Sequence, residues 1–287
     1  MPSLLDLHLL PSPLVDPLSY PGATLRHSFL WLDDWVYRIR PQPGAGGLGW
    51  GVDIDGGPLA PRGPVGRLDD ALRWTGAPPM TERWPVLAFG SNAAPAQLST
   101  KFGSLGPARR TIPVLRGSVA GLALGHSPHV SIPGYLPYVI VDGGPDVVLD
   151  AFVLWLDPDQ RAALDRTEPN YRLVQVPGAR YPLRVESMDR IESYSAYQGK
   201  WGALRWPGET SPARAGSQQE ALGRLGREPW FAELLGPGDA QSWIRRLAGD
   251  PGLRDAVKDG FAANGMVVGD GWPEHGPDRA DQLSPRG

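Results

Sequence analysis

Glycine and proline interrupt this chain at short intervals. They number 37 and 32 in 287 residues, about a quarter of the chain. Proline cannot sit in a helix interior and glycine weakens helices and strands alike. The composition therefore favours short strands, many turns and long connections over a helical bundle. With 41% hydrophobic residues, the chain can still build one large domain, or one domain with appendages.

Charge and cysteine content exclude several classes of function. The formal net charge of −3 provides no basic surface for nucleic acid. The absence of cysteine excludes disulfides, thiolate zinc sites and a cysteine nucleophile. No run reaches the ~18 apolar residues of a membrane helix, and residues 1–25 lack the Lys and Arg of a secretory signal. We predict a cytoplasmic protein without membrane partners; the scarcity of Lys among its basic residues suggests a bacterial source.

Residues 86–92 have the pattern of a buried strand that ends in a tight turn. Four apolar residues, 86–89, are followed by Gly90-Ser91-Asn92, which tolerate tight turns and leave backbone N–H groups free. Pro95 stands where a first helical turn would begin. A strand, a glycine-containing turn and a helix N-terminus together predict a pocket for an anion or a polarised carbonyl.

A second pattern surrounds Glu168. The apolar strand 147–156 leads into a helix capped by Asp157-Pro158 and ending near Leu164. Glu168 follows that helix and precedes Pro169, so its side chain is expected to project from a loop at the end of a rigid element, as many catalytic groups do. The alternative is a solvated glutamate, at a helix end where the dipole disfavours negative charge.

The two patterns together resemble the gamma-glutamylcyclotransferase-like family. Phe-Gly-Ser-Asn at 89–92 looks like the Tyr-Gly-Ser-Asn loop that opens that fold, and residues 164–172 resemble its Leu-Asp-x-x-Glu-Gly segment followed by Tyr. The likeness covers roughly residues 84–204 and leaves both ends unexplained. It implies an α+β fold with a mixed, curled or barrel-like sheet and short helices, to which the sequence adds a small C-terminal helical appendage.

The resemblance also implies a reaction. A gamma-glutamyl amide would be cyclised to 5-oxoproline with release of an amine, without metal or organic cofactor. Glu168 would be general acid and base, carrying protons between the two nitrogens of this small-molecule substrate. The implied substrate-binding residues are the turn and one downstream tyrosine: Phe89, Gly90, Ser91, Asn92, Ala93 and Tyr171.

Two departures from the family keep other functions open. Phe89 replaces the usual Tyr, so a hydroxyl is missing unless Tyr171, Tyr194 or Tyr197 supplies it, and Pro169 replaces the usual Gly. One alternative is a non-catalytic ligand-binding or protein-interaction module on the same fold. Another is a hydrolase or acyltransferase of a different small amide.

The patterning divides the chain into four parts. Residues 1–83 are expected to form an N-terminal extension, with a surface arm over 1–25, one long strand or a hairpin over 28–39 and a short helix over 68–74; residues 84–212 are expected to form the core. Residues 213–264 form the helical appendage, and residues 265–287 a partly disordered tail with little that could pack. The G-x-G-x-x-G match at 44–49 lacks the helix that a dinucleotide site requires, and is interpreted as a hairpin loop.

Further strands are expected over 111–123, 130–132, 138–141, 172–176 and 193–197. His126 and His129 are interpreted as surface turn residues, because as metal ligands they lack a third donor nearby. Either could instead serve Ser91 as a nucleophile's base, although nothing in the spacing indicates it. Arg109-Arg110 is expected to be a solvated charge pair, with a lesser chance of clamping a substrate carboxylate.

Overall fold

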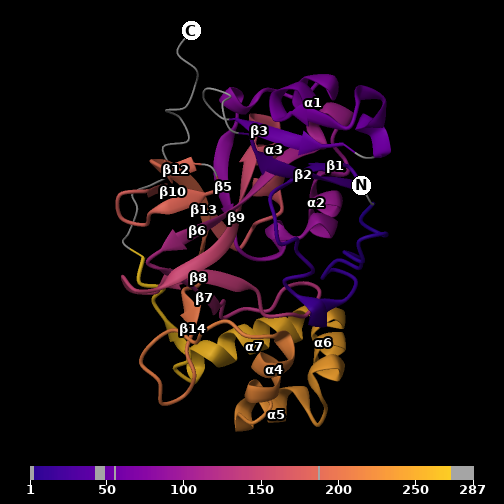
Figure 1. The fold of residues 1–287 in the computed structure, drawn as a ribbon. Coiled ribbons are helices and arrows are strands. Elements are labelled where there is room, and N and C mark those ends of the chain that lie inside the picture. The colour runs from indigo at the N-terminus through magenta and orange to yellow at the C-terminus, as the bar shows by residue number, and fades with distance from the viewer. Residues whose placement is uncertain (1–2, 43–48, 55, 187, 273–287) are drawn as a thin grey trace.

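A large mixed sheet fills the upper part of the molecule, and the C-terminal helices gather below it (Figure 1). The computed structural model describes residues 3–42, 49–54, 56–186 and 188–272. The strand order is β10-β13-β5-β9-β6-β1-β2-β3-β4. These strands are β1 Phe29–Leu32, β2 Trp35–Pro41, β3 Trp50–Asp53, β4 Val65–Arg67, β5 Trp84–Ala88, β6 Thr111–Ala120, β9 Val148–Leu156, β10 Tyr171–Pro177 and β13 Ser193–Gly199.

Smaller strand pairs extend this sheet or lie beside it. Strand β11, Leu183–Val185, pairs with β6 and with β12, Met188–Ile191. A separate hairpin joins β7, Leu122–His126, to β8, Tyr138–Asp142. Strand β14, Ala203–Leu204, pairs with β15, Val267–Val268. Helix α1 spans Leu68–Trp74, α2 Pro95–Phe102 and α3 Pro158–Arg166. The predicted α+β class is confirmed.

Strands β5 and β9 lie side by side at the centre of the sheet. They pair antiparallel, with Val86 opposite Leu154 and Leu87 opposite Val153. Both faces of the sheet are buried here, because Val86 and Leu87 belong to different apolar clusters. The two predicted apolar strands are therefore direct neighbours in one sheet.

Each face of the sheet carries its own apolar core. On one face, Leu98 and Phe102 of α2 and Leu164 of α3 pack against the strands. On the other, α1 joins a cluster that also contains Val52 of β3 and Val176 of β10. Since β3 and β10 stand near opposite ends of the strand order, the sheet curls around this second core.

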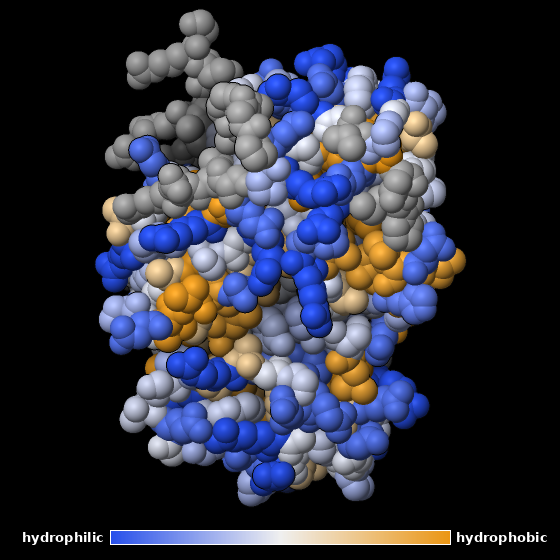
Figure 2. Space-filling model, viewed as in Figure 1, coloured by the Kyte–Doolittle hydropathy of each residue, from blue (hydrophilic) through white to orange (hydrophobic). Residues whose placement is uncertain are grey.

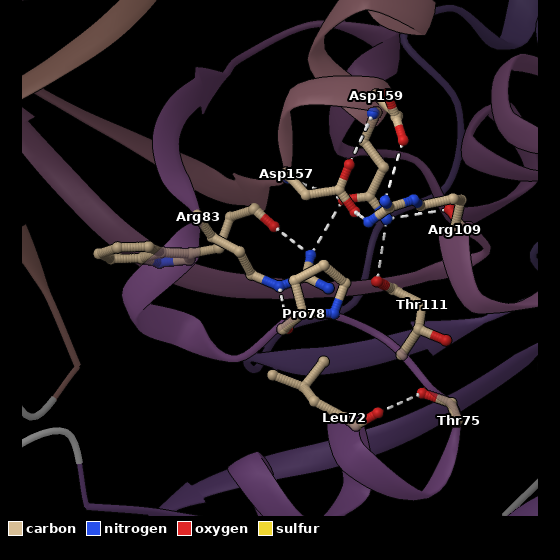
Figure 3. Close-up of polar contacts among 10 residues, drawn as sticks. Leu72, Thr75, Pro78, Arg83, Arg109, Thr111, Asp157 and Asp159 are labelled. Carbon is tan, nitrogen blue, oxygen red and sulfur yellow. Dashed lines mark hydrogen bonds and ion pairs between the residues drawn. The ribbon is translucent and has the colours of Figure 1, made fainter. Parts of the chain in front are cut away.

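A buried polar network holds the beginning of α3 (Figure 3). Asp157 and Gln160 form a capping box, with bonds of 2.9 and 3.0 Å between each side chain and the other's backbone N–H. Arg83, 5% exposed, donates to the Gln160 side chain and to the Trp155 carbonyl, both at 2.9 Å. Burial lowers the pKa of Arg83 to about 10, so it remains a cation at neutral pH. The helix that precedes Glu168 is thus fixed at its start.

The expected solvated pair at Arg109-Arg110 is wrong. Arg109 forms ion pairs with Asp157 and Asp159 at 2.9 Å, as Figure 3 shows, and Arg110 pairs with Asp33 at 2.8 Å. Their carboxylate partners lie far away in the sequence, so only the folding of the sheet brings them together. Neither arginine lines the cavity described below.

The C-terminal helices enclose an apolar cluster of their own. Helices α4 Gln218–Leu225, α5 Pro229–Leu235, α6 Ala240–Gly249 and α7 Pro251–Ala263 surround Phe231 and Phe261, which are fully buried. Val130 and Leu136, from the loop between β7 and β8, join the same cluster. The predicted appendage is confirmed, and it packs on the sheet domain through that loop.

Two local expectations are wrong. Residues 130–132 form no strand; they lie in the loop 127–137, where Pro128, Pro133 and Pro137 interrupt any ladder and a Ser131 side chain closes a turn on the Tyr135 carbonyl at 2.9 Å. The beginning of the tail does pack, because Met266 is fully buried and Trp272 stacks on Tyr181. Residues 273–287 and most of the glycine motif at 44–49 lie outside the described residues.

The N-terminal arm is only partly a surface element. Leu4 and Leu9 pack into the core beside α2 and α3, and Tyr20 is 6% exposed. Other apolar side chains of the arm remain exposed to solvent: Leu5, Leu10, Leu14 and Val15. Figure 2 shows several separate hydrophobic areas on one face of the molecule, with hydrophilic residues between them. No helix of the described residues is long and apolar enough to cross a membrane.

We predict that Phe231→Ala lowers the free energy of unfolding by about 3–5 kcal/mol, because it leaves a large cavity in the helical cluster. Leu234→Ala on the same helix is the control, since Leu234 is 37% exposed and its loss should cost about 1 kcal/mol or less. Urea denaturation measures both. Because the loop 127–137 connects the sheet domain to the helical cluster, one cooperative transition is expected. Two separate transitions would show the helices to be an independent module.

Candidate functional site

A cavity of about 560 Å³ lies where four segments meet. Its walls come from the N-terminal arm, the turn after β5 with α2, the loop 127–137, and the segment after α3. Most of the predicted site residues line it: Phe89, Gly90, Ser91, Asn92, Glu168 and Tyr171. The structure thus brings the turn and Glu168 together, although 76 residues separate Glu168 from Asn92.

Glu168 is held by two neighbours on one of its oxygens. Its Oε1 accepts a hydrogen bond from Asn92 Nδ2 at 3.0 Å and forms an ion pair with Lys101 Nζ. Lys101 also donates to Asn92 Oδ1 at 2.6 Å, so each of the three side chains contacts the other two. The Glu168 side chain is 12% exposed, and within the described residues no hydrogen bond reaches its Oε2. One carboxylate oxygen is therefore anchored while the other is available to a ligand.

Helix α2 supplies Lys101 because of its amphipathic pattern. Leu98 and Phe102 face the apolar core, while Gln97 and Lys101, one helical turn apart, line the cavity. Pro95 begins the helix directly after the turn, so Asn92 and Lys101 are fixed relative to each other. Lys101 was missed in the sequence because a lone lysine at a helix C-terminus is usually a solvated residue that complements the dipole.

The turn after β5 offers fewer backbone donors than expected. The Ala93 N–H donates to the Gly90 carbonyl and the Ala94 N–H to that of Ser91, both at 3.0 Å. Ala93, 5% exposed, packs into the core and does not line the cavity, so its predicted binding role is not supported by its position. In the described part of the chain, the N–H groups of Ser91 and Asn92 have no acceptor. These two donors remain for a ligand.

Tyrosines form much of the cavity wall. Tyr20 stacks on Tyr135 with ring centroids 4.2 Å apart, and its hydroxyl accepts from the Tyr138 N–H at 2.9 Å. A Cβ on Gly90 would lie 2.7 Å from that hydroxyl, so this position needs glycine. The N-terminal arm thus puts a phenolic oxygen against the turn. The sequence did not predict this, because nothing local links residues 20 and 90.

Three tyrosine hydroxyls were predicted as substitutes for the phenolic group that Phe89 lacks, but each is hydrogen-bonded elsewhere. Tyr171 donates to the Tyr138 carbonyl, Tyr194 to the Tyr181 carbonyl and Tyr197 to Asp165, at 2.6–3.0 Å. Tyr135 is another candidate, because it lines the cavity together with Ser91 and Glu168. Burial and the charge of Glu168 raise the pKa of Tyr135 to about 12. At neutral pH this phenol keeps its proton and can donate it in a hydrogen bond.

His126 and His129 are not surface residues, which corrects the sequence interpretation. They are 1% and 5% exposed, because the C-terminal segment covers their turn. His126 Nε2 accepts from the Gly216 N–H at 3.2 Å, and His129 Nδ1 lies 2.6 Å from Ser127 Oγ. Within the described residues no imidazole contacts Ser91, and no group of three His, Asp or Glu side chains could hold a metal ion.

No family model and no curated protein matches the sequence. Among solved structures, the chain is similar to gamma-glutamyl cyclotransferases. One such structure is 12% identical, with 68% of this chain and 93% of that chain covered and a TM-score of 0.35; another, specific to glutathione and from yeast, is 14% identical, with 62% and 96% covered and a TM-score of 0.31.

A protein from Arabidopsis thaliana, solved in solution, is 19% identical, with 53% of this chain and 87% of that chain covered and a TM-score of 0.30. Values this low leave the functional argument to the geometry of the cavity.

We predict that acid destabilises the protein through the two buried histidines. Burial lowers the pKa of His126 and of His129 from 6.5 to about 4. As the pH falls below 6.5, the two imidazoles bind protons in the unfolded chain but stay neutral in the folded chain. The free energy of unfolding therefore falls until about pH 4. The loss is on the order of 3 kcal/mol for each imidazole.

Urea denaturation at pH 7.5 and pH 5 measures the part of this loss that is present at pH 5, about 2 kcal/mol for each imidazole. His129→Asn should reduce it because asparagine does not titrate. NMR gives a direct check: the C2–H signals of both imidazoles should not titrate between pH 7.5 and 5. A midpoint near 6.5 for either signal would contradict the prediction.

Proposed function

We propose that this protein cyclises a gamma-glutamyl amide to 5-oxoproline and releases an amine, with Glu168 as general acid and base. The observation that supports this most is the free Oε2 of Glu168 in a cavity that also holds the unpaired N–H groups of Ser91 and Asn92. A proton acceptor and a pair of oxyanion donors are the two groups that the reaction needs.

The reaction begins at the substrate's α-ammonium group. Glu168 Oε2 accepts a proton from it, and the freed nitrogen attacks the γ-carbonyl carbon to close a five-membered ring. Negative charge then develops on the carbonyl oxygen, which the N–H groups of Ser91 and Asn92 can bind. Tyr135, which lines the same cavity, is the third donor we assign to that oxygen.

Collapse of the intermediate breaks the bond to the leaving amine. Over the reaction the α-nitrogen gives up two protons and the leaving nitrogen takes up two, departing as an ammonium ion. Glu168 carries these protons in turn and ends as the carboxylate it was at the start. The cavity holds the substrate folded, which lowers the entropic barrier to ring closure. This chemistry requires no metal or organic cofactor.

Two other functions remain alternatives. A hydrolase of another small amide would use the same residues, with water in place of the internal amine. A non-catalytic binding module is favoured by one observation: Glu168 Oε1 is already engaged in an ion pair with Lys101. We also propose that residues 1–83 are an extension that completes the wall of a cavity built on the core 84–212, and that residues 213–264 support the loop 127–137 of that wall, in a protein of the cytoplasm.

Glu168→Gln is expected to lower the rate of 5-oxoproline release by ~10²- to 10⁴-fold, because glutamine keeps the side chain's volume but cannot carry protons. The assay uses a panel of gamma-glutamyl amino acids and amines. Glu233→Gln, an exposed residue of α5, is the control and should be unchanged. Circular dichroism confirms that both variants are folded. Undiminished release by Glu168→Gln would remove this residue from the mechanism.

Phe89→Tyr tests the departure from the family. Phe89 is half-buried, lines the cavity and packs beside Tyr20, Tyr135 and Tyr138, so an added hydroxyl would enter a partly polar wall. We expect higher activity or a changed order of preference among the panel's amines, because the hydroxyl adds a hydrogen-bonding group. In a pure binding module, where no substrate turns over, the substitution would produce no 5-oxoproline at all.

A further inference from the structure

Lys101 has an unused hydrogen-bond donor inside the cavity. Its ammonium group has three N–H donors, and two are used by Asn92 Oδ1 and Glu168 Oε1. No other acceptor among the described residues contacts the group, although the side chain is only 8% exposed. Since Lys101 lines the cavity, its third N–H is available to a ligand there.

The free donor of Lys101 and the free acceptor of Glu168 lie next to each other. The ion pair joins Lys101 Nζ to Glu168 Oε1, so the free Oε2 lies on the same carboxylate. Asn92 hydrogen-bonds to both side chains and fixes their positions relative to each other. The cavity thus offers one cation and one anion side by side, each with one position for a ligand.

Another buried acceptor on the same side of α2 also lacks a partner. Gln97 is one helical turn before Lys101, is 3% exposed and lines the cavity. Its Oε1 is buried, and no described residue donates to it. An unpaired buried amide oxygen costs free energy unless a ligand donates to it. A ligand with several N–H donors, such as an ammonium group, would satisfy both Gln97 and Glu168.

The backbone of the turn is not free to take every negative group of a substrate. The N–H groups of Ala93 and Ala94 already have acceptors, and the proposed reaction uses those of Ser91 and Asn92 for the γ-carbonyl oxygen. A carboxylate elsewhere on the substrate therefore needs another donor. The third N–H of Lys101 is a charged one, and hydrogen bonds between charged groups are the stronger kind.

Charge balance favours a ligand that carries both signs. The Lys101–Glu168 pair is neutral as a unit, so a ligand with a single charge would leave an uncompensated charge beside two side chains that are only 8% and 12% exposed. A zwitterion adds one positive and one negative group, and each can pair with its opposite. An amino acid carries both groups on one carbon, which matches two binding atoms that are adjacent.

We propose that Lys101 binds the α-carboxylate of the substrate while Glu168 and Gln97 receive its α-ammonium group, so that the site selects compounds with a free, zwitterionic amino-acid head. This rests on the proposed function for the identity of the reacting group. It makes Lys101 a specificity-determining residue that touches the substrate but transfers no proton.

The kinetic test compares a gamma-glutamyl amide with its α-carboxamide counterpart, which lacks the negative charge. The wild-type enzyme should prefer the carboxylate by ~10- to 100-fold in kcat/KM. Lys101→Met keeps most of the length of the side chain and removes its charge; it should raise the KM for the carboxylate relative to the KM for the carboxamide by a similar factor and so abolish the preference. Lys101→Arg, which keeps the charge, should restore part of it. Equal losses for both substrates in Lys101→Met would show a merely structural role and overturn the proposal.

Binding measurements separate this proposal from the proposed reaction. By calorimetry, L-glutamate should bind the wild-type protein ~10- to 100-fold more tightly than Lys101→Met, while 4-aminobutyrate, which has no α-carboxylate, should bind both proteins equally weakly. This result would support the role of Lys101 even if no amide is turned over. Absence of L-glutamate binding to the wild type, or equal binding to both proteins, would overturn the proposal even if turnover is found.

Discussion

The pairing of β5 with β9 is the interaction on which the site depends. The turn after β5 lies at one end of this strand pair, and α3 begins at the other end, where β9 finishes. Helix α3 then runs back toward the turn. Because α3 is pinned at its start by Arg83 and its capping box, its end is confined, and Glu168 meets Asn92. The contact between Asn92 and Glu168, which are far apart in the chain, therefore depends on the β5–β9 pairing, on the buried Arg83 and on the length of α3.

The walls of the cavity come from the core and the N-terminal arm, and the helical appendage supports one of the core's loops. The N-terminal arm contributes Tyr20, and the loop 127–137 contributes Tyr135 and His129. That loop contains three prolines and forms no regular strand. The helical cluster beneath it helps to fix it, because the Gln218 side chain bonds to both backbone groups of Leu136 at 2.8 and 2.9 Å. The appendages therefore have a direct structural connection to the site.

The ion pair in the cavity has a cost as well as a use. Taking two charges out of water is unfavourable, and a buried ion pair is often no more stabilising than apolar packing would be. Lys101 and Glu168 are both nearly buried, yet each keeps one position unsatisfied toward the cavity. Incomplete pairing of this kind does little for stability, but it prepares a site for a ligand with matching groups.

The sequence by itself determined the local structure and half of the site. Apolar runs, the proline at the start of α2 and the Asp157 and Ser217 caps depend on neighbours within a few residues, so β5, β9, α3 and the C-terminal helices were predictable. The turn at Asn92 and Glu168 stood out because strong local patterns flank them. Only the tertiary structure decided the rest: Tyr20 at the turn, Lys101 on Glu168 and the burial of His129. Each depends on contacts between distant segments, and a single tyrosine, lysine or histidine carries no local sign of which surface the fold will bring against it.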